Sequence, residues 1–323
     1  MKSPLTLFAA FCVSTPLFAQ PIDIGPPPGR LIDVGGRKLH LHCTGSGSPT
    51  VILEAGASAF AIDWSLVQRE VARAHRVCSY DRAGSGWSDP PKAVETPAGV
   101  VQDLHALLQA AGEKPPFVMV GASLGGIYVR LYQAQYPDGV AGMVLVDPAA
   151  EDRLFTVSEG KPVLIAALTA EQLRSTVPPG PVAVPPRPPQ TGAPFDRLPR
   201  DLYELRVKLD RRLIASIPPS VPHEVVVATA EGRRAALARL RETRTAQDHP
   251  LGGRPLVVLT RGTESSQELK DVHAGLARLS TNSRHTVVAN AGHEIHLFEP
   301  AAVIQAISDV SEALRNKARL PPR

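Results

Sequence analysis

The chain has 323 residues, of which 43% are hydrophobic and 20% charged, a composition typical of a globular protein and not of a disordered one. This length predicts one large α/β domain with an insertion, or two domains. The formal net charge is +4 at pH 7, but the arginines are scattered or follow helix faces such as residues 233–244, without interleaved aromatic residues. We therefore expect no nucleic-acid partner.

Residues 1–19 have the pattern of an export signal. Lys2 gives a positive start, residues 5–18 are mostly apolar, and Ala19 offers a small residue before a cut at Gln20. The apolar run is short and interrupted by proline, so we expect no stable membrane insertion after signal cleavage. The mature protein is expected to be periplasmic or secreted, with residues 20–29 as a loose N-terminal arm.

Apolar periodicity and turn residues predict the elements that follow. Two strands at 30–34 and 38–43 flank Gly35-Gly36, which is a hairpin signal. Further strands are predicted at 50–54, 76–80, 117–120, 142–146, 255–260 and 284–289, and helices at 61–74, 96–111, 127–136, 267–279 and 300–315. Strands that alternate with helices form parallel β-α-β units, here after an antiparallel start.

This alternation stops between residues 149 and 250. Helical patterns recur near 169–175, 198–217 and 231–247, whereas the proline-dense stretch 177–194 suits neither a helix nor a central strand. We therefore divide the chain into a core, residues 30–148 and 251–323, and a mostly helical cap or lid insertion at 149–250.

A G-x-S-x-G motif lies between the strand that begins at Phe117 and the helix that follows it. It reads Gly121-Ala122-Ser123-Leu124-Gly125. A serine at such a strand-to-helix turn has a strained backbone, needs small neighbours, and presents its hydroxyl above the sheet. This context favours Ser123 as a nucleophile over a chance match.

A serine hydroxyl needs a base within hydrogen-bond reach, and histidine is the usual one. His293 is the best candidate because it follows the last strand, in Ala-Gly-His, at the carboxyl end of the sheet. His296 is a lesser rival. The other histidines considered lie on predicted strand or helix faces and are interpreted as structural.

The base also needs a carboxylate to fix its tautomer. Asp147 ends the sixth strand, and Glu264 follows the seventh. Aspartates at strand ends also serve turns, and Glu264 lies in a polar stretch where an ordinary exposed glutamate would lie. We favour Asp147, because a rigid strand end suits a preorganised site; Glu264 remains the alternative acid.

The oxyanion of a tetrahedral intermediate needs amide donors. The amide after the nucleophile belongs to Leu124. The small residues 55–59 follow the third strand and permit a close backbone approach, so Ala57 is the expected second donor, although a tight turn alone would also explain them.

With these residues the chain resembles the α/β-hydrolase superfamily over about residues 30–148 and 250–315. The G-A-S-L-G-G elbow, the Y-D-R-A-G-S-G-W-S-D segment after the fourth strand and the late A-G-H carry the resemblance. It implies an α/β-hydrolase fold, with a mostly parallel eight-stranded sheet flanked by helices. It also implies Ser123 as nucleophile, His293 as base, and Ala57 and Leu124 as oxyanion donors.

The same resemblance leaves the acid open, since it usually follows the seventh strand, as Glu264 does, but in haloalkane-dehalogenase relatives follows the sixth, as Asp147 does. Serine at the elbow, where those relatives have aspartate, argues against dehalogenase or epoxide hydrolase chemistry. One departure concerns the oxyanion turn, which commonly begins His-Gly and here begins Ala55-Gly56. The hydrogen bonds that support this loop must therefore differ.

Cys12 leaves with the signal, so Cys43 and Cys78 remain. A pair of cysteines in an exported protein indicates a disulfide, with two separate buried thiols as the alternative. The resemblance implies that the second and fourth strands are antiparallel neighbours, which would bring the two cysteines together and favours the disulfide.

The sequence thus predicts an exported, carboxylesterase-like serine hydrolase that cleaves a small-molecule carboxylic ester through an acyl-enzyme. No metal or organic cofactor is expected, because neither metal-ligand spacing nor a dinucleotide-binding G-x-G-x-x-G is present. Two alternatives stay open. One is a proline-iminopeptidase-like aminopeptidase, which would need an acidic pocket; the other is a catalytically idle hydrolase fold that serves as a binding protein.

Overall fold

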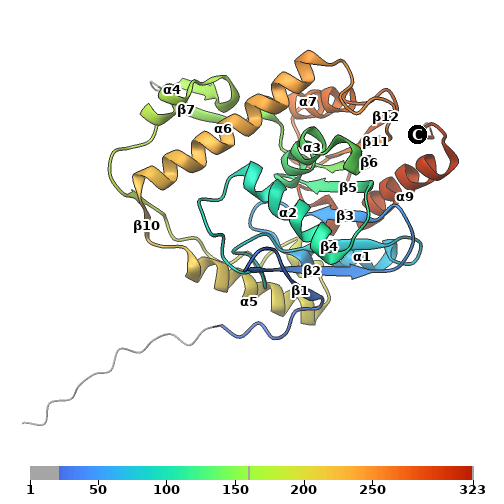
Figure 1. Cartoon of the computed structure of the whole chain (residues 1–323), viewed down its shortest axis with the longest axis horizontal. Helices are drawn as coiled ribbons and strands as arrows, with labels where there is room; N and C mark the ends of the chain where they lie inside the picture. The colour runs from blue at the N-terminus through green and yellow to red at the C-terminus, as the bar shows by residue number, and fades with distance from the viewer. Residues whose placement is uncertain (1–21, 159–160, 322–323) are drawn as a thin grey trace, which may run out of the picture.

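The computed structural model describes residues 22–158 and 161–321, so the expected signal at residues 1–19 lies outside the described residues. An eight-stranded sheet with the order β1-β2-β4-β3-β5-β6-β11-β12 forms the centre of the molecule (Figure 1). Its strands are β1 (Arg30–Asp33), β2 (Lys38–Thr44), β3 (Val51–Glu54), β4 (Val77–Tyr80), β5 (Phe117–Ala122), β6 (Val140–Val146), β11 (Leu256–Arg261) and β12 (Ser283–Val288).

Most of the sheet is parallel. β2 pairs antiparallel with both β1 and β4, and every other pair in this sheet is parallel. The predicted mostly parallel eight-stranded sheet is therefore confirmed. Because parallel strands all end at the same edge, the loops after β3, β4, β5, β6, β11 and β12 gather there.

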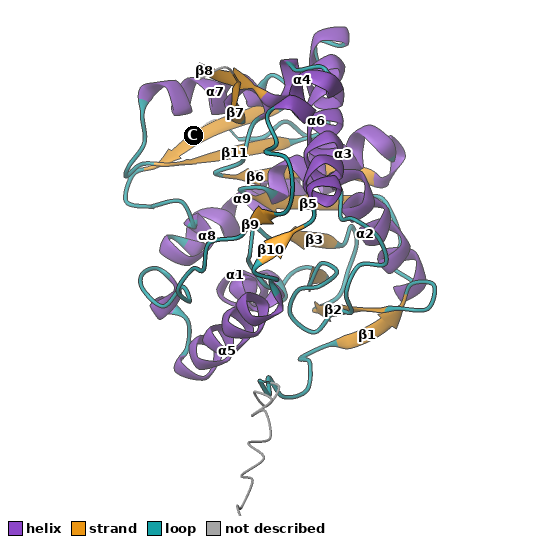
Figure 2. Ribbon diagram, turned by 90° about the vertical axis from the view of Figure 1, so that its left-hand side faces the viewer, coloured by secondary structure: helices purple, strands orange, loops and turns teal. Residues whose placement is uncertain are grey.

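Helices cover both faces of the sheet, as Figure 2 shows. Alternate residues of a strand point to opposite faces, and both faces here are apolar. In β5, Met119 packs in the cluster beneath α2 and α3, whereas Val118 and Val120 pack in the cluster beneath α1 and α9. The helices are α1 (Ser65–Val71), α2 (Pro97–Ala111), α3 (Gly125–Gln135), α7 (Gln267–Ala277), α8 (Ile295–Phe298) and α9 (Pro300–Asn316), with the 3₁₀ turns η1 (Ala61–Trp64) and η2 (Pro137–Gly139).

In the inserted segment, residues 149–250, the residues that the structure describes add no strand to the main sheet. It contains α4 (Ala170–Ser175), α5 (Arg200–Ser216) and α6 (His223–Ala246), the 3₁₀ turns η3 (Glu151–Arg153), η4 (Ile165–Ala167) and η5 (Phe195–Arg197), and two small antiparallel strand pairs, β7 (Phe155–Ser158) with β8 (Lys161–Leu164) and β9 (Val182–Ala183) with β10 (Ser220–Val221). The long helix α6 lies across α2 and α3 (Figure 1). It begins at His223, well before the predicted start near 231.

A buried arginine ties this segment to the core. Arg206 of α5 is fully buried and donates from Nε to Asp63 Oδ1 of η1 at 3.0 Å. Its guanidinium also donates to Gln190 Oε1 at 2.9 Å and lies 3.6 Å from the ring centre of Phe195. Since removing one partner of a buried ion pair leaves an uncompensated charge, this contact fixes α5 against η1.

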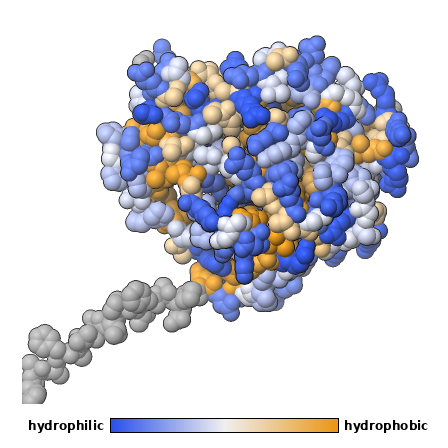
Figure 3. Space-filling view, viewed as in Figure 1, coloured by the Kyte–Doolittle hydropathy of each residue, from blue (hydrophilic) through white to orange (hydrophobic). Residues whose placement is uncertain are grey.

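One face of the molecule is mostly polar. Figure 3 shows a predominantly hydrophilic face on which apolar residues form separate patches. Within residues 22–158 and 161–321, no helix combines the length and the apolar character that crossing a bilayer requires.

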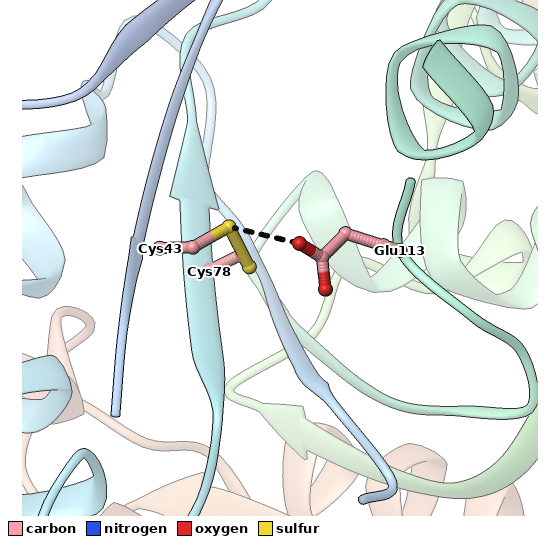
Figure 4. Close-up of side chains that lie close together, drawn as sticks. All are labelled: Cys43, Cys78 and Glu113. Carbon is pink, nitrogen blue, oxygen red and sulfur yellow. Dashed lines mark hydrogen bonds between the residues drawn. A yellow bond between two sulfur atoms is a disulfide. The ribbon is translucent and has the colours of Figure 1, made fainter. Parts of the chain in front are cut away.

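A disulfide joins Cys43 of β2 to Cys78 of β4 at directly paired positions, the same pair that the sequence predicts (Figure 4). The carboxylate of Glu113 lies 3.8 Å from Cys43 Sγ, but a disulfide sulfur has no proton to donate. Arg76 holds this carboxylate instead, through bonds of 2.8 and 2.6 Å. Although these cysteines and Glu113 converge as metal ligands would, disulfide sulfurs are not thiolates, so the group is not a metal site.

The disulfide is expected to stabilise the fold, because it closes a loop with a sequence separation of 35 residues. Loop-closure entropy predicts that the double variant Cys43→Ala/Cys78→Ala loses about 3–4 kcal/mol of unfolding free energy, to be measured by urea denaturation. Thiol titration of the denatured, unreduced mature protein should find no free cysteine; two free thiols would contradict the bridge.

Candidate active site

Ser123 lies at the turn between β5 and α3 with φ of +49°, the left-handed backbone expected of a strained elbow. Close packing explains the neighbouring glycines. A Cβ at Gly121 would lie 2.5 Å from the carbonyl oxygen of Gly125, and one at Gly125 would lie 2.5 Å from the carbonyl oxygen of Glu54. Only glycine therefore lets β5, α3 and β3 approach as closely as they do.

Asp147 follows β6 and also has a positive φ, +42°. Its amide donates to the carbonyl oxygen of Leu259 on β11 at 2.8 Å, and the Ser123 amide donates to that of Val146 at 3.0 Å. The elbow and the acid are thus joined through the backbone of neighbouring strands. The Asp147 side chain is only 2% exposed, and the Arg261 amide donates to its Oδ1 at 3.0 Å.

His293 lies on the loop between β12 and α8. The carbonyl oxygen of Ala291 accepts bonds of 3.1 Å from the amides of both Gly262 and Thr263, which ties this loop to the one after β11. Gly292 is needed where it is, because a Cβ there would lie 2.6 Å from the ring of Phe298. The imidazole keeps 38% of its surface exposed, so a substrate can reach it.

The side chains of Ser123, His293 and Asp147 are joined in series by hydrogen bonds. His293 Nε2 lies 2.9 Å from Ser123 Oγ, and Nδ1 lies 2.5 Å from Asp147 Oδ2. An ionised carboxylate only accepts, so Nδ1 carries the proton and Nε2 is free to accept from the serine hydroxyl. The hydrogen bond to Asp147 raises the pKa of His293 above its ordinary value, against the opposing effect of burial.

Further polar groups, which the sequence did not single out, surround Asp147. The Nη1 atom of Arg261 lies 3.3 Å from Asp147 Oδ2. His273 of α7 is fully buried, lies 2.8 Å from the Pro148 carbonyl oxygen through Nε2, and lies 2.8 Å from Thr260 Oγ1 through Nδ1. Burial lowers the pKa of His273, which favours the neutral ring. This histidine holds the Asp147-Pro148 turn through the Pro148 carbonyl oxygen.

The two rival residues are placed differently. Glu264 also has a positive φ, +51°, but its side chain is exposed, and no hydrogen bond to His293 is found among the described residues. His296 is buried against Trp64, with ring centres 4.6 Å apart, and burial lowers its pKa to about 3. It is a neutral packing residue, and no hydrogen bond to Ser123 is found among the described residues.

The loop after β3 packs directly on the elbow. A Cβ at Gly56 would lie 3.4 Å from Ser123 Cβ, so the Ala55–Ser58 turn lies against Ser123. Across residues 22–158 and 161–321, neither the Ala57 nor the Leu124 amide donates to a protein acceptor. Both expected donors are therefore available to a ligand.

A small cavity of about 80 Å³ adjoins the elbow, between the core and α6. Its lining includes Leu124, Ile127 and Tyr128 from the core, and Ala236 and Leu237 from α6. A larger cavity of about 330 Å³ lies near the amino end of β5, and neither cavity has Ser123, His293 or Asp147 in its lining.

Comparisons with known proteins agree on the fold. Residues 49–300 match the model of the alpha/beta hydrolase fold family. The protein YqjL of Bacillus subtilis is 26% identical over 275 residues, which are 83% of this chain and 86% of YqjL. The 2-hydroxymuconate semialdehyde hydrolase of Pseudomonas sp. strain CF600 is 30% identical over 138 residues, 42% of this chain and 48% of that enzyme.

Solved structures are similar over most of the chain. A putative lipase (lip1) from Acinetobacter baumannii has a TM-score of 0.62 at 19% identity. The similarity covers 89% of this chain and 92% of the lipase chain. A thermophilic esterase from Thermogutta terrifontis has a TM-score of 0.59 at 22% identity, covering 88% of this chain and 97% of its own.

The contact between His293 and Asp147 predicts a specific titration. In Asp147→Asn the carboxylate no longer stabilises the imidazolium while burial persists, so the pKa of His293 should fall below its ordinary value. NMR titration of the histidine ring protons measures this shift. Glu264→Gln is the matched control and should leave the titration unchanged; an equal fall in that variant would contradict the pairing.

Proposed function

The chain belongs to the alpha/beta hydrolase fold family, and we propose that it is a serine hydrolase that cleaves a carboxylic ester. The observation that carries this proposal is the continuous hydrogen-bonded chain from Ser123 Oγ through His293 to Asp147. A nucleophile, a base and an orienting carboxylate in this order are what acyl transfer through a serine requires.

In the proposed reaction, His293 Nε2 removes the hydroxyl proton as Ser123 Oγ attacks the acyl carbon. The imidazolium that forms is stabilised by Asp147 Oδ2, and the negative charge on the carbonyl oxygen is stabilised by the amides of Ala57 and Leu124. The tetrahedral intermediate collapses when the alcohol oxygen leaves with the proton from His293. Water, activated by the same histidine, then hydrolyses the acyl-enzyme.

The inserted segment is proposed to act as a cap that shapes the substrate site. The cavity beside Leu124 is lined by apolar side chains together with Glu95 and Arg233, and α6 contributes Ala236 and Leu237 to it. The names of the similar esterase and lipase agree with an ester substrate.

Export is also part of the proposal. It rests on the signal-like pattern of residues 1–19 and on the disulfide between Cys43 and Cys78, since disulfides persist in oxidising compartments.

The nucleophile is tested with a fluorophosphonate probe, which reacts covalently with activated serines. Purified wild-type protein should be labelled at one site, and Ser123→Ala should not be labelled. A wild-type protein that resists the probe, as an idle binding protein would, or a Ser123→Ala variant labelled equally well, would overturn the proposal.

The acid is tested by ester turnover. Asp147→Asn should lower kcat by about 10⁴-fold, because the wrong tautomer of His293 is favoured, whereas Glu264→Gln should stay close to wild type. A nearly normal Asp147→Asn enzyme together with an impaired Glu264→Gln enzyme would assign the role to Glu264.

The pH profile follows from the raised pKa of His293. The base must be neutral to accept a proton, so kcat/KM should be full above this pKa and should fall as the pH drops through it. Residual activity of Asp147→Asn should keep its value down to lower pH. An acid limb that does not move in this variant would contradict the role of the carboxylate.

A further inference from the structure

The Ala55-Gly56 turn is supported by an arginine from the neighbouring strand end. Arg82 follows β4. Its Nη1 donates to the Ala55 carbonyl oxygen at 2.8 Å, and its Nη2 donates to the Gly56 carbonyl oxygen at 2.5 Å. One guanidinium therefore holds two successive carbonyl groups of the turn that packs on Ser123.

The second of these bonds bears on the proposed oxyanion site through the geometry of the peptide bond. The Gly56 C=O and the Ala57 N–H belong to the same planar trans unit, so they point in opposite directions. When Arg82 fixes the Gly56 oxygen, the direction of the Ala57 N–H is fixed as well. A charged donor on the oxygen also polarises the peptide, which strengthens the N–H as a donor.

Arg82 is itself held in place. Its Nη1 atom forms an ion pair of 2.6 Å with Oε1 of Glu54, whose side chain is fully buried at the end of β3. The other oxygen of Glu54 accepts a short hydrogen bond from the Tyr80 hydroxyl. The guanidinium carbon of Arg82 also lies 5.4 Å from the ring centre of Tyr128 on α3. With its side chain only 10% exposed, Arg82 has little freedom to leave the turn.

The backbone that carries Arg82 is fixed one residue earlier. Asp81 is buried, accepts from the Ala61 amide at 2.8 Å, and pairs with His40 Nδ1 at 2.7 Å. Gly86 passes so close to this carboxylate that a Cβ there would lie 2.1 Å from Asp81 Oδ2. The backbone after β4 is therefore held in place where it carries Arg82, and a residue on a rigid segment is suited to a positioning role.

We propose that Arg82 is a positioning residue that orients the Ala57 amide toward the oxyanion, with Glu54 and Tyr80 holding the arginine. This inference rests on the proposed function, because it assigns a role within the same acyl transfer. Arg82 touches no reacting atom and acts through the peptide between Gly56 and Ala57.

The informative variant is Arg82→Lys. A lysine keeps the positive charge next to buried Glu54, but a single ammonium lacks the fork that reaches two carbonyl oxygens and a carboxylate together. Loss of one oxyanion donor costs about 10²–10³ in rate, so its misorientation should lower kcat/KM by about 10- to 100-fold.

The matched control is Arg76→Lys. Arg76 precedes β4 and Arg82 follows it, and Arg76 also binds a glutamate, Glu113, through two bonds of 2.8 and 2.6 Å. It lies at the opposite end of the strand from the elbow. Its substitution should leave kcat/KM within about twofold of wild type.

The test compares inhibition by two small molecules in purified full-length protein. With phenyl acetate as the substrate, 1,1,1-trifluoroacetone is the ketone, which adds to Ser123 and places its oxyanion at the donors. Phenol, the alcohol product, binds without an oxyanion. In Arg82→Lys, the Ki of the ketone should rise by the same factor by which kcat/KM falls, while the Ki of the alcohol should stay unchanged. Partial misfolding would lower kcat without moving either Ki.

The proposal is overturned if Arg82→Lys keeps normal kcat/KM, or if kcat/KM falls while the Ki of the ketone does not change. Failure of the proposed function has a different signature, because Ser123→Ala would then retain the esterase activity of the wild type. An active, Ser123-dependent enzyme that is insensitive to Arg82→Lys would refute the role of the arginine alone.

Discussion

The buried carboxylate of Asp147 is the constraint on which the rest of the candidate site depends. An ionised carboxylate that is only 2% exposed needs donors around it, and it receives them from the Arg261 amide and from His293 Nδ1. To present both oxygens, the backbone at Asp147 takes a left-handed conformation. The pairing of β6 with β11 and β5 holds that conformation, so the sheet bears the strain that orients the imidazole.

A second buried carboxylate acts in a similar way at the other side of the elbow. Glu54 ends β3, and its charge is matched by Arg82 from the end of β4. The first anion fixes the orientation of His293, the proposed base, and the second fixes Arg82, which supports the proposed oxyanion turn. Both arrangements use the common edge at which parallel strands end, where loops from separate parts of the sequence meet.

The sequence predicted well the features that depend on residues close together in the chain. Alternating strands and helices, the small residues around Ser123 and the Ala-Gly-His loop are contiguous signals. The start of α6 at His223 was missed, because valines and Gly232 weaken the helical pattern there. Tertiary packing explains the glycine, since a Cβ at this position would lie 2.6 Å from Thr96. The sequence alone could not decide whether Asp147 or Glu264 pairs with His293. Both residues follow strands at the same edge of the sheet, and only the fold sets their distances from His293. Arg82 lay within a recognised motif, but its contact with Ala55 and Gly56 needs the pairing of β3 with β4.

The most direct measurement of the central claim is rapid-quench mass spectrometry of the full-length protein with p-nitrophenyl acetate. A serine nucleophile predicts an acetyl group that appears before steady state, that maps to the peptide containing Ser123, and that is lost on further incubation. Ester turnover without any acetylated protein, or with the acetyl group on another residue, would contradict the assignment of Ser123 as the nucleophile.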